Sequence, residues 1–152
     1  MRKRLAPAGD GNRGWRVLVA SADPRVRAWA RDCLPVDASL CAFADDSSVV
    51  ADVARADWAN LCLLDLRLPG DALAAVRELS ESAPAVRIVA WAPSDDVPEL
   101  VEAVDAGAIG CVAGEPDRGA LARALDDILA GRPALPRAVV ARLVAQLRGP
   151  SS

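Results

Sequence analysis

Residues 61–70 read Leu-Cys-Leu-Leu-Asp-Leu-Arg-Leu-Pro-Gly and carry the clearest strand signal in the chain. The continuous apolar run from Leu61 to Leu64 is typical of a strand that is buried on both faces of a parallel sheet. The run closes on one acid, Asp65, and the following Pro69 and Gly70 favour a turn. The stretch therefore predicts a buried strand that delivers a carboxylate to the carboxyl-terminal edge of a sheet.

Four further apolar runs alternate with helical patterns on either side of this strand. The predicted strands are 16–20, 38–43, 61–65, 86–91 and 109–113, and the predicted helices are 23–34, 46–56, 71–81, 96–106, 117–130 and 137–148. Strands separated by helices indicate βαβ units, hence a parallel sheet with helices on both faces. Five such units predict an α/β, flavodoxin-like (βα)5 doubly wound sheet of order 2-1-3-4-5, followed by a C-terminal linker-like helix. In such a sheet, chemistry occurs beyond the carboxyl ends of the strands.

The 152 residues predict one compact domain with two appendages. We expect a disordered arm over 1–14, a domain over 15–131, and a linker or tail helix over 132–152. The formal net charge is −3, which indicates neither a nucleic-acid nor a membrane partner. The apolar runs are too short to span a bilayer and no secretory signal opens the chain, so we expect a cytoplasmic protein.

Histidine is absent, and the four cysteines form no C-x-x-C pair. The pattern predicts buried, reduced thiols rather than a metal site or a disulfide. Lack of histidine removes the commonest general base and the Ser-His and Cys-His nucleophile pairs, which argues against an enzyme. The cysteines are Cys33, Cys41, Cys62 and Cys111.

Three motifs give the chain a family resemblance. They are LLDLRLPG at 63–70, VEAVDAGAIG at 101–110 and AGRP at 130–133. Over about residues 15 to 135 the chain resembles the receiver domain of response regulators, in particular the NarL/FixJ type. The resemblance implies a regulatory module of the fold described above, with Asp65 at the position of the phosphoacceptor aspartate.

The other functional positions of that family are changed. Two adjacent acids that hold magnesium are replaced by Ser21 and Ala22, a Ser or Thr by Ala92, and a Lys by Gly114. Phosphoryl transfer is catalysed mainly by charge and position, and a lone carboxylate recruits Mg²⁺ weakly. We therefore expect a degenerate pocket around Asp65 with no metal and no cofactor.

Two readings stay open for this pocket. It either closes, which we favour because cores avoid voids, or accepts an apolar effector beside Trp91 and Arg67. Asp65 could pair with Arg67 or accept hydrogen bonds from backbone amides. Asp23 is predicted to cap the helix that begins at Pro24 rather than to bind metal.

The leading functional hypothesis is a phosphorylation-independent pseudo-receiver that acts by dimerisation or partner contact in transcriptional control. One alternative is a conventional receiver phosphorylated on Asp65 by a histidine kinase. Another is a flavodoxin-like protein that binds a small ligand or cofactor, which the lack of glycine over 21–24 disfavours. In NarL/FixJ regulators the receiver leads into a helix-turn-helix domain, so the partner is either such a domain in the same full-length chain or another regulator. We expect residues 1–152 themselves to bind no nucleic acid.

The tail helix carries an apolar stripe, formed by Val140, Leu143, Val144 and Leu147. Arg137, Arg142, Gln146 and Arg148 add polar character. Pro133 and Pro136 separate this helix from the domain, which favours an outward helix that pairs two copies in a homodimer. The alternative is that the stripe folds back on its own domain.

Overall fold

The computed structural model describes residues 14–93, 97–114 and 117–149. Within them, five parallel strands form one sheet in the order β2-β1-β3-β4-β5, as predicted, with β3 in the centre. The arm expected over 1–14 lies almost entirely outside the described residues. The strands are β1 (Trp15–Ala20), β2 (Ala38–Ala44), β3 (Leu61–Asp65), β4 (Arg87–Ala92) and β5 (Gly110–Ala113).

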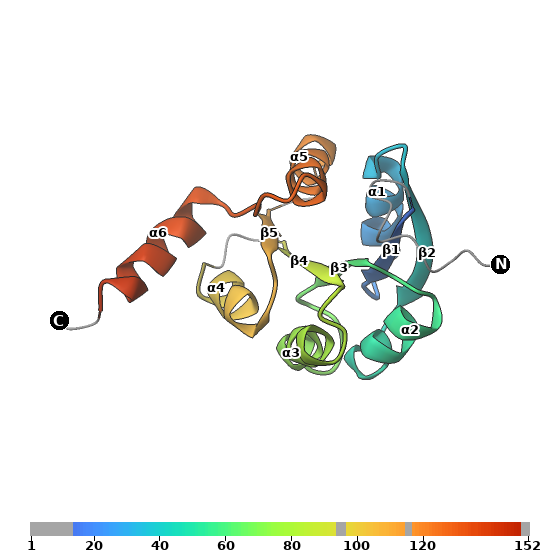
Figure 1. The fold of residues 1–152 in the computed structure, drawn as a ribbon, viewed down its shortest axis with the longest axis horizontal. Coiled ribbons are helices and arrows are strands. Elements are labelled where there is room, and N and C mark those ends of the chain that lie inside the picture. Colours follow the sequence, from blue (N-terminus) through green and yellow to red (C-terminus); the bar gives the residue numbers. More distant parts are fainter. Residues whose placement is uncertain (1–13, 94–96, 115–116, 150–152) are drawn as a thin grey trace.

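Helices cover both faces of the sheet (Figure 1). They are α1 (Pro24–Cys33), α2 (Val50–Ala56), α3 (Ala72–Ser82), α4 (Val97–Ala106), α5 (Arg118–Leu129) and α6 (Arg137–Leu147), with a short 3-10 turn η3 (Ser47–Val49) before α2. Helices α1 and α5 lie on one face, and α2, α3 and α4 lie on the other. Every predicted strand and helix is present, and the ends differ by a few residues.

The central strand is buried along its whole length. Successive side chains of a strand point to opposite faces, so Leu61 and Leu63 pack with α1 and α5 while Cys62 and Leu64 pack with α2, α3 and α4. This double burial explains the continuous apolar run in the sequence. It also fixes Asp65 at the carboxyl-terminal edge of the sheet, next to the last residues of β1 and β4.

Aspartates begin three of the helices that follow the strands. The side chain of Asp23 accepts a hydrogen bond from the backbone N–H of Arg25 at the start of α1. In the same way Asp71 accepts from the N–H of Ala74 in α3, and Asp117 accepts from the N–H of Gly119 in α5. Each satisfies a backbone donor that the first helical turn leaves open. The capping role predicted for Asp23 is thereby confirmed.

All four cysteines are free thiols, but only three are buried. Burial raises the pKa of the Cys62 and Cys111 thiols to about 12. The prediction is wrong for Cys41, which is half-buried because it lies in edge strand β2, at a bulge where Leu40 and Ala42 pair with consecutive residues of β1. No helix in the described part of the chain has the length and apolar character needed to cross a membrane.

The segment that leads to α6 joins the sheet before the helix begins. Ala134 forms a parallel bridge with Gly110, and its carbonyl oxygen accepts a hydrogen bond of 2.7 Å from the N–H of Cys111. Helix α6 then runs beside α4 and extends outward (Figure 1). The tail is thus anchored to the domain at one end.

The four residues of the predicted apolar stripe of α6 do not share one environment. Val139, which the stripe omitted, is fully buried, and Leu143 packs partly against the same core. Val140 and Val144 are each 41% exposed and Leu147 is 86% exposed. The helix carries two neighbouring apolar faces, and the i, i+4 pair of Val139 and Leu143 is the one that meets the core.

Candidate functional site

The carboxylate of Asp65 is 2% exposed and has a hydrogen-bond donor on every side. Its Oδ2 accepts from the hydroxyl of Ser21 at 2.7 Å and from Arg67 Nη2 at 3.1 Å. Its Oδ1 accepts from the backbone N–H of Arg67 at 2.8 Å and from Arg67 Nε at 3.2 Å. Both alternatives predicted for Asp65, pairing with Arg67 and accepting from a backbone amide, occur together.

Arg67 connects two acids that are far apart in the sequence. Its Nη2 also lies 3.2 Å from Oδ2 of Asp23, so one guanidinium nitrogen contacts both carboxylates. Hydrogen bonding to Asp65 raises the pKa of Arg67 above its ordinary value, so the guanidinium stays charged. Hydrogen bonds from Arg25 above all, and from Arg67, lower the pKa of Asp23 to about 2.

Ser21 is fully buried where the family has an acid. Its Oγ donates to Asp65 and accepts from the backbone N–H of Asp23 at 3.1 Å. Its carbonyl oxygen accepts from Arg27 Nε at 3.0 Å. A neutral hydroxyl therefore connects β1 to β3 without adding negative charge beside Asp65.

Trp91 forms the floor of the site. The side chain is 1% exposed, and the guanidinium of Arg67 lies 4.9 Å above its ring. Its Nε1–H donates to the carbonyl oxygen of Gly114 at 3.0 Å, and the ring of Trp29 packs at a centroid distance of 5.5 Å. The indole thus connects the ends of β4 and β5 and offers Arg67 a cation–π platform.

The predicted degenerate pocket is only partly assembled. Ser21 and Ala22 lie near Asp65, but Ala92 is buried on the opposite face of the sheet from Trp91, because neighbouring residues of a strand alternate faces. Ala92 and Trp91 therefore do not line one pocket. Beside Trp91, where an apolar effector was predicted, the guanidinium of Arg67 lies over the ring. An open hollow of about 250 Å³ does lie at the site, lined by Ala22, Asp23, Asp65, Arg67 and Pro69.

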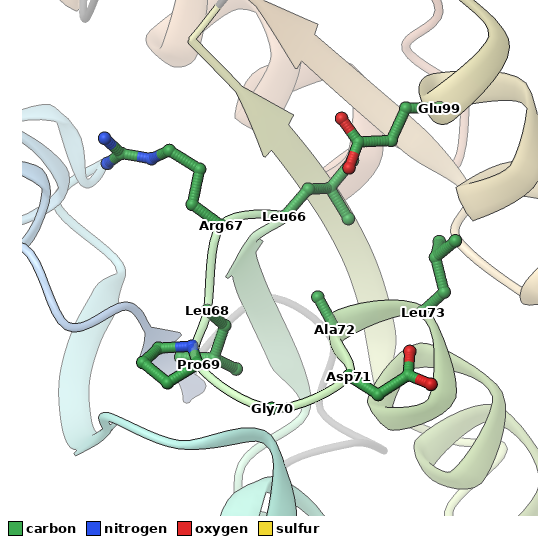
Figure 2. Close-up of a pocket in the computed structure, with 9 residues that line it drawn as sticks. All are labelled: Leu66, Arg67, Leu68, Pro69, Gly70, Asp71, Ala72, Leu73 and Glu99. Carbon is green, nitrogen blue, oxygen red and sulfur yellow. The ribbon is translucent and has the colours of Figure 1, made fainter.

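A second hollow lies on the other side of the loop that follows β3. Figure 2 shows the side chain of Arg67 pointing away from the other labelled side chains, while Glu99 and Leu73 come from α4 and α3. The guanidinium of Arg67 contacts Asp65 instead. Its volume is about 520 Å³, and it is shallow and lined by both polar and apolar residues. It is lined by Leu66, Arg67, Leu68, Pro69, Gly70, Asp71, Ala72, Leu73 and Glu99.

The oxygen atoms around Asp65 do not form a suitable set of ligands for a magnesium ion. Mg²⁺ prefers oxygen ligands in near-ideal octahedral geometry, usually one or two carboxylates with waters. Here both carboxylates already bind the guanidinium of Arg67, whose positive charge opposes a second cation in the same place. Among the described residues no group of three or more His, Cys, Asp or Glu side chains is placed to hold a metal.

Fold and site together define a signalling domain of the receiver class, with an aspartate at the end of the central strand. The family model of the response regulator receiver domain matches residues 17–126, and the chain belongs to this family. The match covers β1 from Val17 onward, the other four strands completely and most of α5.

The relatives include LuxR- and NarL-type regulators. The DNA-binding transcriptional activator DevR/DosR of Mycobacterium tuberculosis is 33% identical over 137 residues, which make up 88% of this chain and 63% of that protein. The chain therefore spans less than two thirds of this relative. A LuxR-family two-component response regulator from Aurantimonas sp. SI85-9A1 is 27% identical with a TM-score of 0.75, covering 88% of this chain and 96% of that structure.

One further solved structure shares the fold. The receiver domain of the putative response regulator NarL from Mycobacterium tuberculosis is 24% identical with a TM-score of 0.71, and the match covers 79% of this chain and 99% of that chain. The family match and the 33% identical relative confirm, at the level of the family, the resemblance inferred from motifs 63–70, 101–110 and 130–133.

Sequence reasoning missed the second contact of Asp23. Its capping role explained the residue fully, and nothing in the sequence indicated that a residue 44 positions later contacts the same carboxylate. The available signal was the arginine two residues beyond Asp65, because the doubly wound fold brings the loops after β1 and β3 together.

Proposed function

We propose that the chain is a phosphorylation-independent pseudo-receiver that regulates transcription through dimerisation or contact with a partner. The observation that carries the proposal is the arrangement of four hydrogen bonds on the Asp65 carboxylate, two of them on each oxygen. In this arrangement Asp65 stabilises the fold and its own charge is neutralised. Asp65 and Arg67 form a structural ion pair at the position where the family has its reactive aspartate.

The chemistry of aspartyl phosphorylation explains why this arrangement opposes the reaction. A carboxylate oxygen must attack phosphorus, and the developing charge on the phosphoryl oxygens must be neutralised. To free either oxygen, Arg67 has to leave, and that removes the strongest donor from a carboxylate that is 2% exposed. Ser21 and Ala22 supply no second carboxylate for a metal, and Gly114 supplies no ammonium group.

A partner-binding role agrees with the relatives and with α6. DevR/DosR is described as a DNA-binding transcriptional activator, and a solved structure contains two RcsB dimers bound to DNA. The partly exposed Val140 and Val144 and the exposed Leu147 offer a surface for a second copy. The proposal includes a cytoplasmic, non-enzymatic protein without cofactor. Its DNA-binding function would belong to a further domain of the full-length chain or to a partner regulator.

Phosphorylation on Asp65 is the second candidate, because the aspartate keeps its place at the end of β3. The decisive experiment incubates the full chain with acetyl phosphate and MgCl₂ and follows intact mass. We expect no phosphorylated species in the wild type, as in an Asp65→Asn variant treated in parallel. A phosphorylated fraction that appears in the wild type and is absent from Asp65→Asn would replace the pseudo-receiver by a conventional receiver.

A further inference from the structure

We propose that the basic segment 1–13, which lies outside the described residues, binds back on the domain at the exposed indole of Trp58. The segment places a cation against the face of the indole, as arginines within the domain do on other aromatic rings. The inference goes beyond the proposed function and is independent of it. Trp58 lies in the loop that leads into β3, at the opposite end of that strand from Asp65, and α6 lies on the far side of the molecule from α2 (Figure 1).

Trp58 occupies a position where neither burial nor backbone preference favours a tryptophan. Its side chain is 56% exposed. Its φ is +56°, and within the described part of the chain it is the only residue other than glycine with a positive φ. Asp57 ends α2, so Trp58 takes the place after a helix that glycine or asparagine usually fills. Strained residues that persist in a fold cluster at binding sites, so the exposed indole indicates a binding role.

The loop that carries Trp58 is fixed to the residues at which the basic segment joins the domain. The guanidinium of Arg16 donates to the carbonyl oxygen of Asp57, from Nε at 3.0 Å and from Nη2 at 2.7 Å. The side-chain oxygen of Asn60 accepts from the N–H of Arg16 at 2.8 Å, and its Nδ2 donates to the carbonyl oxygen of Gly14 at 3.4 Å. The loop is therefore held beside Gly14, within reach of the residues that precede it.

An arginine over an aromatic ring is a recurring contact of this domain. The guanidinium of Arg87 lies 5.0 Å from the ring centre of Trp15. That of Arg67 lies 4.9 Å from the ring centre of Trp91. Such pairs are attractive because the face of an aromatic ring carries negative charge density. The exposed indole of Trp58 suits the same kind of group.

The basic segment supplies such groups next to this loop. Its cations are Arg2, Lys3, Arg4 and Arg13. It has one acid, Asp10, whereas the whole chain has a formal net charge of −3, so the rest of the chain is acidic. Opposite net charges attract the segment to the domain, and Asp57 adds a carboxylate directly before Trp58. Arg13 immediately precedes Gly14, so one of the cations is tethered beside the loop.

The experiment uses the full chain labelled with fluorinated tryptophan, and the fluorine NMR signal of Trp58 is assigned by its loss from Trp58→Phe. A Lys3→Gln/Arg4→Gln/Arg13→Gln variant removes three cations of the segment. We expect its Trp58 signal to shift, and the isotope shift between H₂O and D₂O, which measures contact of the ring with solvent, to increase. About 0.5 M NaCl should move the wild-type signal in the same direction, because salt screens charges at the surface.

An Arg137→Gln/Arg142→Gln/Arg148→Gln variant is the matched control, because it removes the same charge from exposed positions along α6 and at its end. Its Trp58 signal should equal that of wild type. The signals of the two buried tryptophans should stay in place in both variants, which shows that the domain remains folded. If the Trp58 signal is the same in wild type and in the variant of the segment, or if both triple variants change it alike, the segment does not bind at Trp58. The inference then fails and the proposed function stands.

Discussion

Asp65 lies at the end of β3, where the family has its phosphoacceptor aspartate, but the residues around it differ from those of the family. In the proposed function Asp65 acts as a hydrogen-bond acceptor and not as a nucleophile, because Ser21 and Arg67 already donate four hydrogen bonds to its two oxygens. Ser21 avoids the repulsion that a second acid would bring, and Arg67 supplies the positive charge that the carboxylate needs when buried. At the scale of single residues, Ser21 and Arg67 together leave the buried carboxylate of Asp65 paired with a positive charge.

The contribution of single charges to the stability of the site can be tested at Asp23. Its pKa is lowered to about 2 in the folded protein, chiefly by Arg25, from an ordinary value of 3.8. A depressed carboxyl pKa contributes stability above the unfolded value and loses it as the pH falls through the folded value. Asparagine caps helices as well as aspartate does, so Asp23→Asn removes the charge and keeps the cap. We expect Asp23→Asn to have a lower Tm than wild type at neutral pH.

The difference in Tm should shrink as the pH falls from about 4 to about 2, where wild-type Asp23 also becomes neutral. Asp52→Asn is the matched control, because Asp52 forms an exposed ion pair with Arg55 on α2, a kind of pair that contributes little. Thermal melts at several pH values measure both variants. A difference in Tm between wild type and Asp23→Asn that stays constant down to pH 2 would contradict this prediction.

At the scale of elements, the loop after β3 is positioned by the turn before α2. The backbone N–H of Ser47 donates to the carbonyl oxygen of Pro69 at 2.9 Å, and the hydroxyl of Ser47 accepts from the N–H of Asp71 at 2.9 Å. Gly70 sits between these contacts with φ +94°. The 3-10 turn η3, which the helical pattern over 46–56 did not predict, thus supports the loop that carries Arg67.

Gly70→Ala should therefore destabilise the domain by about 3 kcal/mol. The left-handed backbone alone costs about 1–2 kcal/mol for a residue with Cβ, and the added Cβ would also collide with Ser47 Oγ. Gly131→Ala is the matched control, because Gly131 has φ +86° and open space around the new Cβ, so only the backbone cost of about 1–2 kcal/mol applies. Urea denaturation gives both values. Equal losses in the two variants would show that Ser47 does not restrict the loop.

The sequence predicted the elements well for a physical reason. Strands such as 61–65 are buried on both faces, so their apolar runs are continuous and their ends are sharp. Helix α6 was less predictable, because the periodic pattern shows which residues share a face but not which of two adjacent apolar faces meets the core. Val139 and the contact between Asp23 and Arg67 depend on tertiary packing, which no local pattern contains.

At the scale of the whole molecule, α6 divides its apolar residues between the domain and the surface. Val139 and Leu143 hold the helix on the core, while Leu147 and half of Val140 and Val144 remain accessible. Two-fold homodimers are the commonest assemblies, and a patch shared by both copies is what they require. Because Val139 and Leu143 pack on the core, the exposed residues of α6 are held in a fixed position relative to the sheet.

We expect a Val144→Glu/Leu147→Glu variant to be monomeric under conditions where the wild type forms dimers, because paired acids would be buried in the contact. Its Tm as a monomer should match that of wild type, since neither residue belongs to the core. Sedimentation velocity at micromolar concentrations measures the first expectation and thermal melts the second. Arg142→Gln, an exposed change elsewhere on α6, is the control. Identical sedimentation of all three proteins would exclude this face as the contact.

The bridge between Ala134 and Gly110 has a consequence for solubility. A parallel sheet has two edges, and free backbone groups along an edge can recruit other chains into aggregates. In the part of the chain described here, the β5 edge is partly covered by Ala134 and the β2 edge is interrupted by the bulge at Cys41. Shortening the chain to Gly131 would strip one of these protections, and such a fragment should precipitate more readily than the full chain.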